Sequence, residues 1–200
     1  GLVRLKDGSI GSVTIGGTVS PAGGNFDEPV TQATLKVVGA FHGLSRARSD
    51  ARRYPAIDPL ESWSKYTSII DKKRVEQVRA ILRQGNDVAQ MMKVVGEEGT
   101  SIADFIAYLK SEFLDAVYLQ QNAFSDIDAA TPADRQREMF SVVEKALLAA
   151  YPFKQKDEAR KFFQSLTQTC IDWNMTDHVV PEYAERKDAL LRTIKEATHV

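Results

Sequence analysis

Apolar residues follow two different patterns along this chain, and the change comes near Ser62. Before it they form short runs rich in β-branched residues, of which the clearest are residues 12–19 (SVTIGGTV) and residues 35–41 (LKVVGAF). Runs of this length and composition predict two short, largely apolar strands. After Ser62 the apolar residues recur every three or four positions, which predicts amphipathic helices.

The two predicted strands do not make a complete sheet. Strands that are apolar almost throughout belong inside a sheet covered on both faces, and two strands cannot build one. The intervening SPAGGNFDEP is expected to be a loop, because its glycines accept positive φ while Pro21 and Pro29 stop both a helix and a strand ladder. The first third of the chain is therefore predicted to be the end of a larger α/β domain.

The helical part contains several apolar stripes that predict the core of a helix bundle. Two short helices are expected to end at glycines, Gly85 and Gly96, which suit the C-terminal cap of a helix. The predicted stripes are Val75, Val78, Ile81 and Leu82; Val88, Met91, Met92 and Val95; Ile102, Phe105, Ile106, Leu109, Phe113 and Val117; Phe140, Val143 and Leu147; Ala159, Phe162, Phe163, Leu166 and Cys170; and Leu190, Leu191 and Ile194.

Two of these helices have clear start signals. Ser101 followed by Asp104 predicts an N-cap with a capping box. Thr131 followed by Pro132 predicts a second start, with the proline at the first helical position, where its missing N–H costs nothing. That helix is expected to end before Tyr151.

Composition and charge exclude several classes of function. The 200 residues are 43% hydrophobic and 26% charged, with a formal net charge of -1, so nothing predicts binding to nucleic acid or to an anionic membrane surface. No apolar run approaches the roughly 18 residues of a membrane span. The single cysteine, Cys170, excludes an intrachain disulfide framework and is expected to be a buried, inert thiol.

Motifs for independent chemistry are missing. His42, His178 and His199 have no paired-ligand spacing, so no metal site is predicted. The phosphate loop G-x-x-x-x-G-K-[ST], which surrounds ATP phosphates with backbone N–H groups and a lysine, does not occur either. No residue of this chain is therefore predicted to be catalytic.

Seven short motifs nevertheless point to one family, because they occur together and in one order. The chain resembles the catalytic A subunit of the rotary V-type (archaeal-type) ATPases. One departure lies at Asp58-Pro59, where A-type members usually carry Asn-Trp and the related F-type β subunit resembles this chain more. The motifs are SVTI at 12–15, VSPAGG at 19–24, EPVTQ at 28–32, R-x-YPAIDPL at 52–60, YLQQNAF at 118–124, KDEARKFF at 156–163 and DWN at 172–174.

The resemblance implies a mainly α fold in two parts. Residues 1–65 would be the last strands and loops of a truncated α/β (P-loop ATPase) nucleotide-binding domain, and residues 66–200 a C-terminal helical bundle. The chain would then be a C-terminal piece of the subunit, with the phosphate loop and the other catalytic groups upstream. The isolated piece is expected to be inactive and to hold no nucleotide.

For the intact subunit the resemblance implies ATP hydrolysis or synthesis coupled to transmembrane transport of protons or sodium ions. ATP or ADP with Mg²⁺ would be the bound nucleotide. B subunits in an alternating A3B3 hexamer and the subunits of the central rotor stalk would be the partners. The location would be cytoplasmic, in the peripheral part of a membrane-bound complex without direct membrane insertion.

The resemblance also assigns roles to particular residues. Tyr54 matches the aromatic residue that stacks on adenine, and Tyr118 and Phe124 match the pair that closes the other side of the adenine pocket. From the residues alone, Tyr54 would be a turn residue packed under Pro55, and the other two would be bundle core. A turn that matches the rotor-facing loop consists of Gly96, Glu97, Glu98 and Gly99.

Two other interpretations remain open. A free-standing helical interaction module with an unrelated β segment is one, because bundles without a catalytic set commonly act as scaffolds. The non-catalytic B subunit of the same complex is the other, although VSPAGGNFDEPVTQ matches the A subunit better. A reading frame with several hundred upstream residues and a phosphate loop would exclude the first.

Overall fold

The computed structural model describes residues 2–198 of the chain, which divide into two compact units. The first unit extends to Gly39 and the second starts at Ala40. Residues 40–65, predicted to belong to the nucleotide-binding part, pack within the second unit. The division into compact units therefore does not test where the nucleotide-binding part ends. The domain boundary between residues 65 and 66 stays a prediction.

The first unit contains little regular structure. Strand β1 (Val3–Arg4) pairs in antiparallel fashion with β2 (Ile10–Gly11), with Val3 opposite Gly11. A single 3₁₀ turn (Ala22–Gly24) and helix α1 (Pro29–Val37) follow.

Both strands predicted in this region are wrong. Residues 12–19 form no regular structure, and Val13 and Ile15 are 86% and 90% exposed, because no described strand pairs with them. Residues 35–37 belong to α1. Pro29 starts this helix instead of preventing it, since a proline at the first helical position needs no N–H partner. Within 35–41 a strand forms at Ala40 and Phe41.

The second unit begins with a short hairpin-like segment and continues as helices. Strand β3 (Ala40–Phe41) pairs in antiparallel fashion with β4 (Trp63–Ser64), and the short helix α2 (Arg46–Asp50) lies between them in sequence. The Oγ of Ser45 accepts the N–H of Arg48 and so caps α2.

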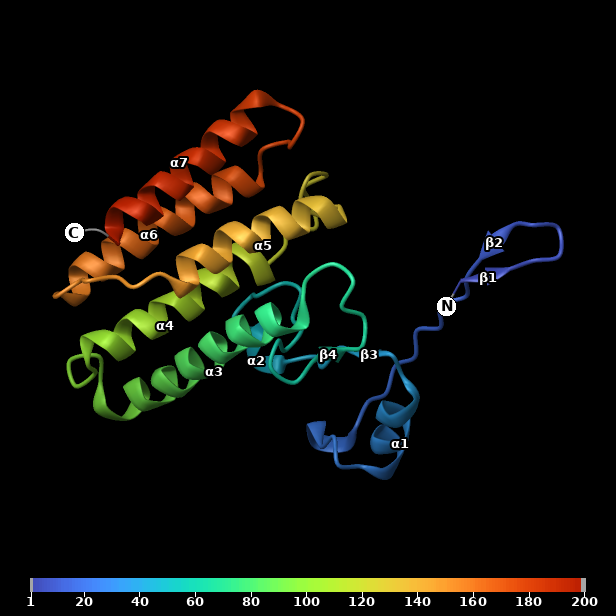
Figure 1. Cartoon of the computed structure of the whole chain (residues 1–200). Coiled ribbons are helices and arrows are strands. Elements are labelled where there is room, and N and C mark those ends of the chain that lie inside the picture. The colour runs from blue at the N-terminus through green and yellow to red at the C-terminus, as the bar shows by residue number, and fades with distance from the viewer. Residues whose placement is uncertain (1, 199–200) are drawn as a thin grey trace. The chain divides into compact units, whose positions relative to one another are not determined.

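Five longer helices form a bundle, which confirms the predicted mainly α fold (Figure 1). Helix α4 packs between α3 and α6, and α7 packs against both α5 and α6. None of the helices between residues 2 and 198 has the length and apolar composition that a bilayer crossing requires. The bundle helices are α3 (Lys72–Val95), α4 (Ile102–Leu114), α5 (Ala133–Leu148), α6 (Lys156–Asn174) and α7 (Pro181–Ala197).

Most of the predicted apolar stripes meet in one core, but the stripe at the end of α3 does not, since Met91 and Val95 are exposed. The largest fully buried members of this core within the second unit are Trp173, Leu114, Leu147, Leu166 and Leu190. Burial of such side chains removes apolar area from water and is the main term that stabilises the bundle.

Gly85 does not end a helix, and this prediction is wrong. It is buried inside α3, where a Cβ would lie 2.1 Å from the Cβ of Ser111 on α4. The missing side chain lets the two helices approach closely, and the helix continues for ten more residues to Val95. Gly96, with φ of 77°, is confirmed as the C-cap.

The predicted start of α4 is confirmed, while that of α5 is shifted. Ser101 Oγ accepts the N–H of Asp104 at 3.1 Å, and its hydroxyl donates to the Asp104 carboxylate at 2.7 Å. Pro132 is the N-cap of α5 instead of its first helical residue, because its ψ of 156° is extended. Helix α4 continues directly into one π-helical turn, Asp115–Leu119.

Candidate functional site

The π-helical turn and the loop after it line one side of a large pocket. The pocket has a volume of about 640 Å³ and lies within the second unit. Residues that are far apart in sequence meet here, from the segment after α2 to the end of α6. The lining residues are Tyr54, Ala116, Gln120, Gln121, Asn122, Ala123, Phe124, Asp128, Ile171, Asn174 and Met175.

Tyr54 and Phe124, predicted to face one another across a base, line this same pocket. Their exposed fractions are 57% and 100%, so both rings have free faces. The N–H of Gln121 donates to the carbonyl of Tyr54 at 2.7 Å and ties the two segments together. A pair of free aromatic faces can hold a planar heterocycle by stacking.

The loop that carries Phe124 is held by side-chain hydrogen bonds. The buried Asp128 carboxylate accepts the N–H of Asn122 at 2.6 Å, and Asn122 Oδ1 in turn accepts the N–H of Phe124 at 3.0 Å. Asx interactions of this kind fix tight turns. Asp128 therefore helps to fix the conformation of the loop that carries the exposed Phe124 ring.

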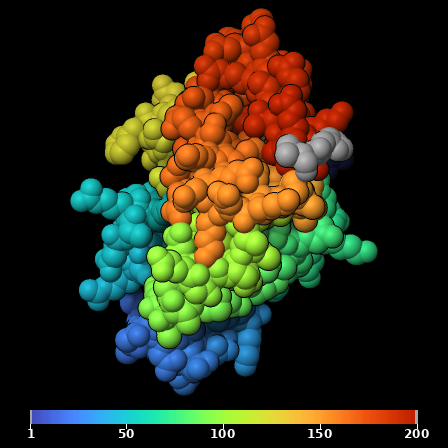
Figure 2. Space-filling model, turned by 90° about the vertical axis from the view of Figure 1, so that its left-hand side faces the viewer, coloured from blue at the N-terminus to red at the C-terminus, as the bar shows by residue number. Residues whose placement is uncertain are grey.

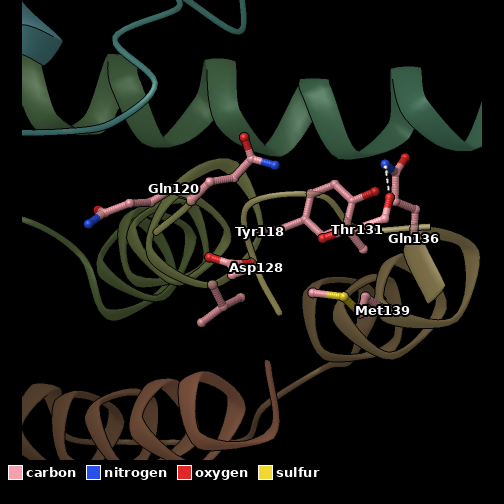
Figure 3. Close-up of a pocket in the computed structure, with 8 residues that line it drawn as sticks. Tyr118, Gln120, Asp128, Thr131, Gln136 and Met139 are labelled. Carbon is pink, nitrogen blue, oxygen red and sulfur yellow. Dashed lines mark hydrogen bonds between the residues drawn. The ribbon is translucent and has the colours of Figure 1, made fainter. Parts of the chain in front are cut away.

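Tyr118, the third predicted contact, does not line the large pocket. Its ring packs edge-on against Phe140 with 5.6 Å between centroids, and burial raises its pKa to about 12. It lines a smaller neighbouring pocket of about 150 Å³ (Figure 3), close to Thr131 and Gln136. Three residues line both pockets: Gln120, Gln121 and Asp128.

Asn174 forms part of the lining that sequence reasoning missed. Its Nδ2 donates to the carbonyl of Val117 at 2.6 Å, which satisfies a carbonyl at the helix end. Its backbone carbonyl accepts from the guanidinium of the buried Arg135. Its Oδ1 is buried and accepts no hydrogen bond from residues 2–198. The only sequence signal for it was its place in the DWN motif.

The turn Gly96 to Gly99 forms as predicted but is tied to α6. The Glu97 carboxylate pairs with Arg160, and Lys156 Nζ donates to the carbonyls of Glu97 and Glu98. Figure 2 shows the first turns of α6 (orange) directly beside this turn (light green). The Glu98 side chain remains exposed.

Comparisons with known proteins decide which family carries this geometry. Residues 2–64 match the nucleotide-binding domain of the ATP synthase alpha/beta family, and residues 72–161 match the C-terminal domain of V and A type ATP synthase. The V-type ATP synthase alpha chain of Treponema denticola is 58% identical over 98% of this chain and 33% of its own length. The chain matches a C-terminal portion of V-type ATP synthase alpha chains. The resemblance predicted from the sequence motifs is thereby confirmed.

Further V-type ATP synthase alpha chains give the same result. Alpha chain 1 of Treponema pallidum is 62% identical over 87% of this chain and 30% of its own length. The alpha chain of Borreliella burgdorferi is 57% identical over 95% of this chain and 33% of its own length. The chain thus spans about a third of the length of these V-type relatives.

A solved structure shares the fold. The ATP synthase subunit NeqB of Nanoarcheaum equitans superposes with a TM-score of 0.52 over 63% of this chain and 32% of its own chain. Its sequence identity of 17% limits the likeness to the fold.

Proposed function

We propose that this chain is the C-terminal part of the catalytic A subunit of a rotary V-type ATP synthase. The intact subunit would bind ATP or ADP with Mg²⁺ and couple ATP hydrolysis or synthesis to proton or sodium transport. Its partners would be B subunits in an alternating A3B3 hexamer and the central rotor stalk. The identity of 58% to an alpha chain over 98% of the sequence supports this assignment over a free-standing module or a B subunit.

Within that subunit, the 640 Å³ pocket takes the adenine base. The observation that carries this proposal is that Tyr54 and Phe124, 70 positions apart in the sequence, line one pocket with exposed rings. Tyr118 remains in the proposal as a residue of the adenine pocket that lies farther from the base, because the small pocket that it lines shares lining residues with the large one.

The pocket supplies base stacking and leaves the phosphates to groups outside this chain. Stacking contributes on the order of 1 to 3 kcal/mol, while charge-assisted contacts to phosphate are needed for tight binding and for stabilising the transferred phosphoryl group. The isolated chain therefore hydrolyses no ATP, and it holds nucleotide only weakly.

The turn Gly96 to Gly99 is proposed to face the central rotor. Its ties to Arg160 and Lys156 on α6 support this role. Through these contacts, a force applied to the turn would be transmitted to α6 and so to the rest of the bundle. Glu98, exposed and acidic, would meet the rotor surface directly.

The proposal is tested by the kinetics of the assembled complex with Tyr54→Ala and Phe124→Ala. Each substitution is expected to raise KM for MgATP by about 5- to 160-fold, because it removes a stack that contributes roughly 1 to 3 kcal/mol equally in the ground and transition states. The value of kcat should change little. Tyr54→Phe should be mild, since the ring face makes the contact.

Tyr66→Ala is the matched control, because Tyr66 is an exposed tyrosine that does not line the pocket. Its KM should equal that of the unmodified complex. Unchanged KM in both pocket variants, with normal assembly, would refute the base contact.

A further inference from the structure

We propose that Asp115 is a positioning residue that fixes the segment before Tyr54 against the bundle and so aims the Tyr54 ring into the large pocket. The inference rests on the proposed base contact of Tyr54. It adds a residue that touches no nucleotide and lies outside the pocket lining.

The first observation is a double ion pair on one buried carboxylate. Asp115 Oδ1 lies 2.6 Å from Nη2 of Arg48, and its Oδ2 lies 3.3 Å from Nε of Arg53. The Arg53 guanidinium also reaches Glu112 at 3.2 Å and Gln120 at 3.4 Å. Both oxygens of Asp115 therefore hold arginines from the segment that leads into Tyr54.

The second observation is the charge of that segment. Residues 46–53 read RARSDARR, with four arginines against one aspartate, Asp50, which pairs with the exposed Arg46. Like charges so close in sequence repel one another unless acidic groups compensate them. The side chain of Arg48 is only 15% exposed, so it depends on Asp115 for that compensation.

The third observation is the backbone at Asp115. It is the first residue of the π-helical turn, and its carbonyl accepts the N–H of Gln120 at 2.9 Å. The next N–H, that of Gln121, donates to the carbonyl of Tyr54. Asp115 thus binds the arginine segment through its side chain and supports, through its backbone, the turn that holds Tyr54. Isolated π-helical turns are often found at functional sites.

Tyr54 itself has little other support. Its ring is 57% exposed, so side-chain packing does not fix its direction. The position from which the ring extends is then set by its backbone, which the Arg53 ion pair and the Gln121 hydrogen bond hold on either side. Loss of the Asp115 charge would leave Arg48 buried and unpaired, and the segment would move outward to hydrate it.

A first experiment measures the segment directly by limited trypsin digestion of the 200-residue chain. Asp115→Asn should accelerate cleavage after Arg48, Arg52 and Arg53 by about tenfold, because cleavage follows local opening. Glu144→Gln is the matched control: the Glu144 side chain is 14% exposed against 12% for Asp115, and it pairs with Arg74 elsewhere in the bundle.

The control should leave cleavage after these three arginines unchanged. Equal cleavage rates in Asp115→Asn and the unmodified chain would overturn the proposal. If Asp115→Asn does not fold, as judged by circular dichroism, Arg53→Gln replaces it and is read by cleavage after Arg48 and Arg52, because the substitution removes the trypsin site at residue 53. It breaks the Arg53 ion pair at a more exposed position and leaves the Arg48 pair intact.

A second experiment measures the consequence in the assembled complex, with MgATP as the probe. Asp115→Asn should raise KM about 3- to 10-fold at nearly constant kcat. Combining it with Tyr54→Ala should add little to the effect of Tyr54→Ala alone, because both act through one ring. Fully additive effects would show that Asp115 acts elsewhere and would overturn the positioning role.

The two proposals fail in different ways. Unchanged KM in Tyr54→Ala would refute the base contact itself. A raised KM in Tyr54→Ala with an unchanged KM in Asp115→Asn would refute only the role of Asp115.

Discussion

Tyr54 and Tyr118 lie next to the same polar loop, yet their side chains have different environments. The Tyr54 ring is open to the large pocket, while the Tyr118 ring packs on Phe140 with its pKa raised to about 12 by burial. The motifs YPAIDPL and YLQQNAF pointed to both residues alike. Which of them has a free ring face depends on the packing of α5, which a local motif does not contain.

Cys170 offers a test of the core at the scale of one residue. The thiol is buried, and burial raises its pKa to about 12. In the folded chain it should therefore react with a disulfide reagent at about pH 8 only as fast as the bundle opens. Labelling that accelerates in step with urea-induced unfolding is expected, and rapid labelling of the folded chain would contradict the burial.

The same shift predicts the pH dependence of stability. The thiol ionises near pH 9 in the unfolded chain, while in the folded chain it stays protonated until about pH 12. Its contribution to the free energy of unfolding is therefore full below pH 9 and is lost as the pH rises from 9 to 12. Cys170→Ala should reduce the alkaline fall in the free energy of unfolding by up to about 1.4 kcal/mol per pH unit.

At the scale of elements, helices were predictable and strands were not. Stripes such as Phe140, Val143 and Leu147 specify a helix locally, because the apolar face recurs within the element itself. The run 12–19 needs a partner strand to pair its backbone, and no described residue supplies one. The sequence wrongly predicted a helix end at Gly85. A glycine is needed there because Ser111 of another helix, 26 positions away in the sequence, packs closely against it.

Gly85→Ala tests this close approach of α3 and α4. Alanine should gain about 1 kcal/mol in helix propensity but lose more, because its Cβ would overlap that of Ser111 and overpacking costs about 1 to 3 kcal/mol. The free energy of unfolding in urea is therefore expected to fall. Asn86→Ala, at an exposed neighbouring position, is the control and should not reduce it.

The clash also predicts coupling between the two positions. Ser111→Gly should recover part of the loss in the Gly85→Ala background, with an interaction energy of about 0.5 to 3 kcal/mol. A stability of Gly85→Ala equal to or above that of the unmodified chain would show that the helices do not approach so closely.

At the scale of the whole molecule, the two units differ in how much structure they hold by themselves. The second contains the helix bundle and its core, while the first has one two-residue strand pair, a 3₁₀ turn and one helix. The described apolar side chains of the first unit are largely exposed, including Val13, Ile15 and Val37. Stability should therefore be concentrated in the bundle.

Amide hydrogen exchange on the 200-residue chain can measure this difference. Residues 101–118 should exchange slowly, because their N–H groups lie in helices packed against the core, and residues 12–41 should exchange faster by orders of magnitude. Stronger protection in 12–41 than in 101–118 would contradict the proposed division of stability.

The most direct test of the central claim is to locate the adenine base by photoaffinity labelling of the complete subunit with an azidoadenine nucleotide and Mg²⁺. Label is expected on the tryptic peptides of residues 54–65 and 111–135, which carry Tyr54 and Phe124, and excess MgADP should remove it. Nucleotide-protected label confined to other peptides would contradict the claim that this pocket holds the base.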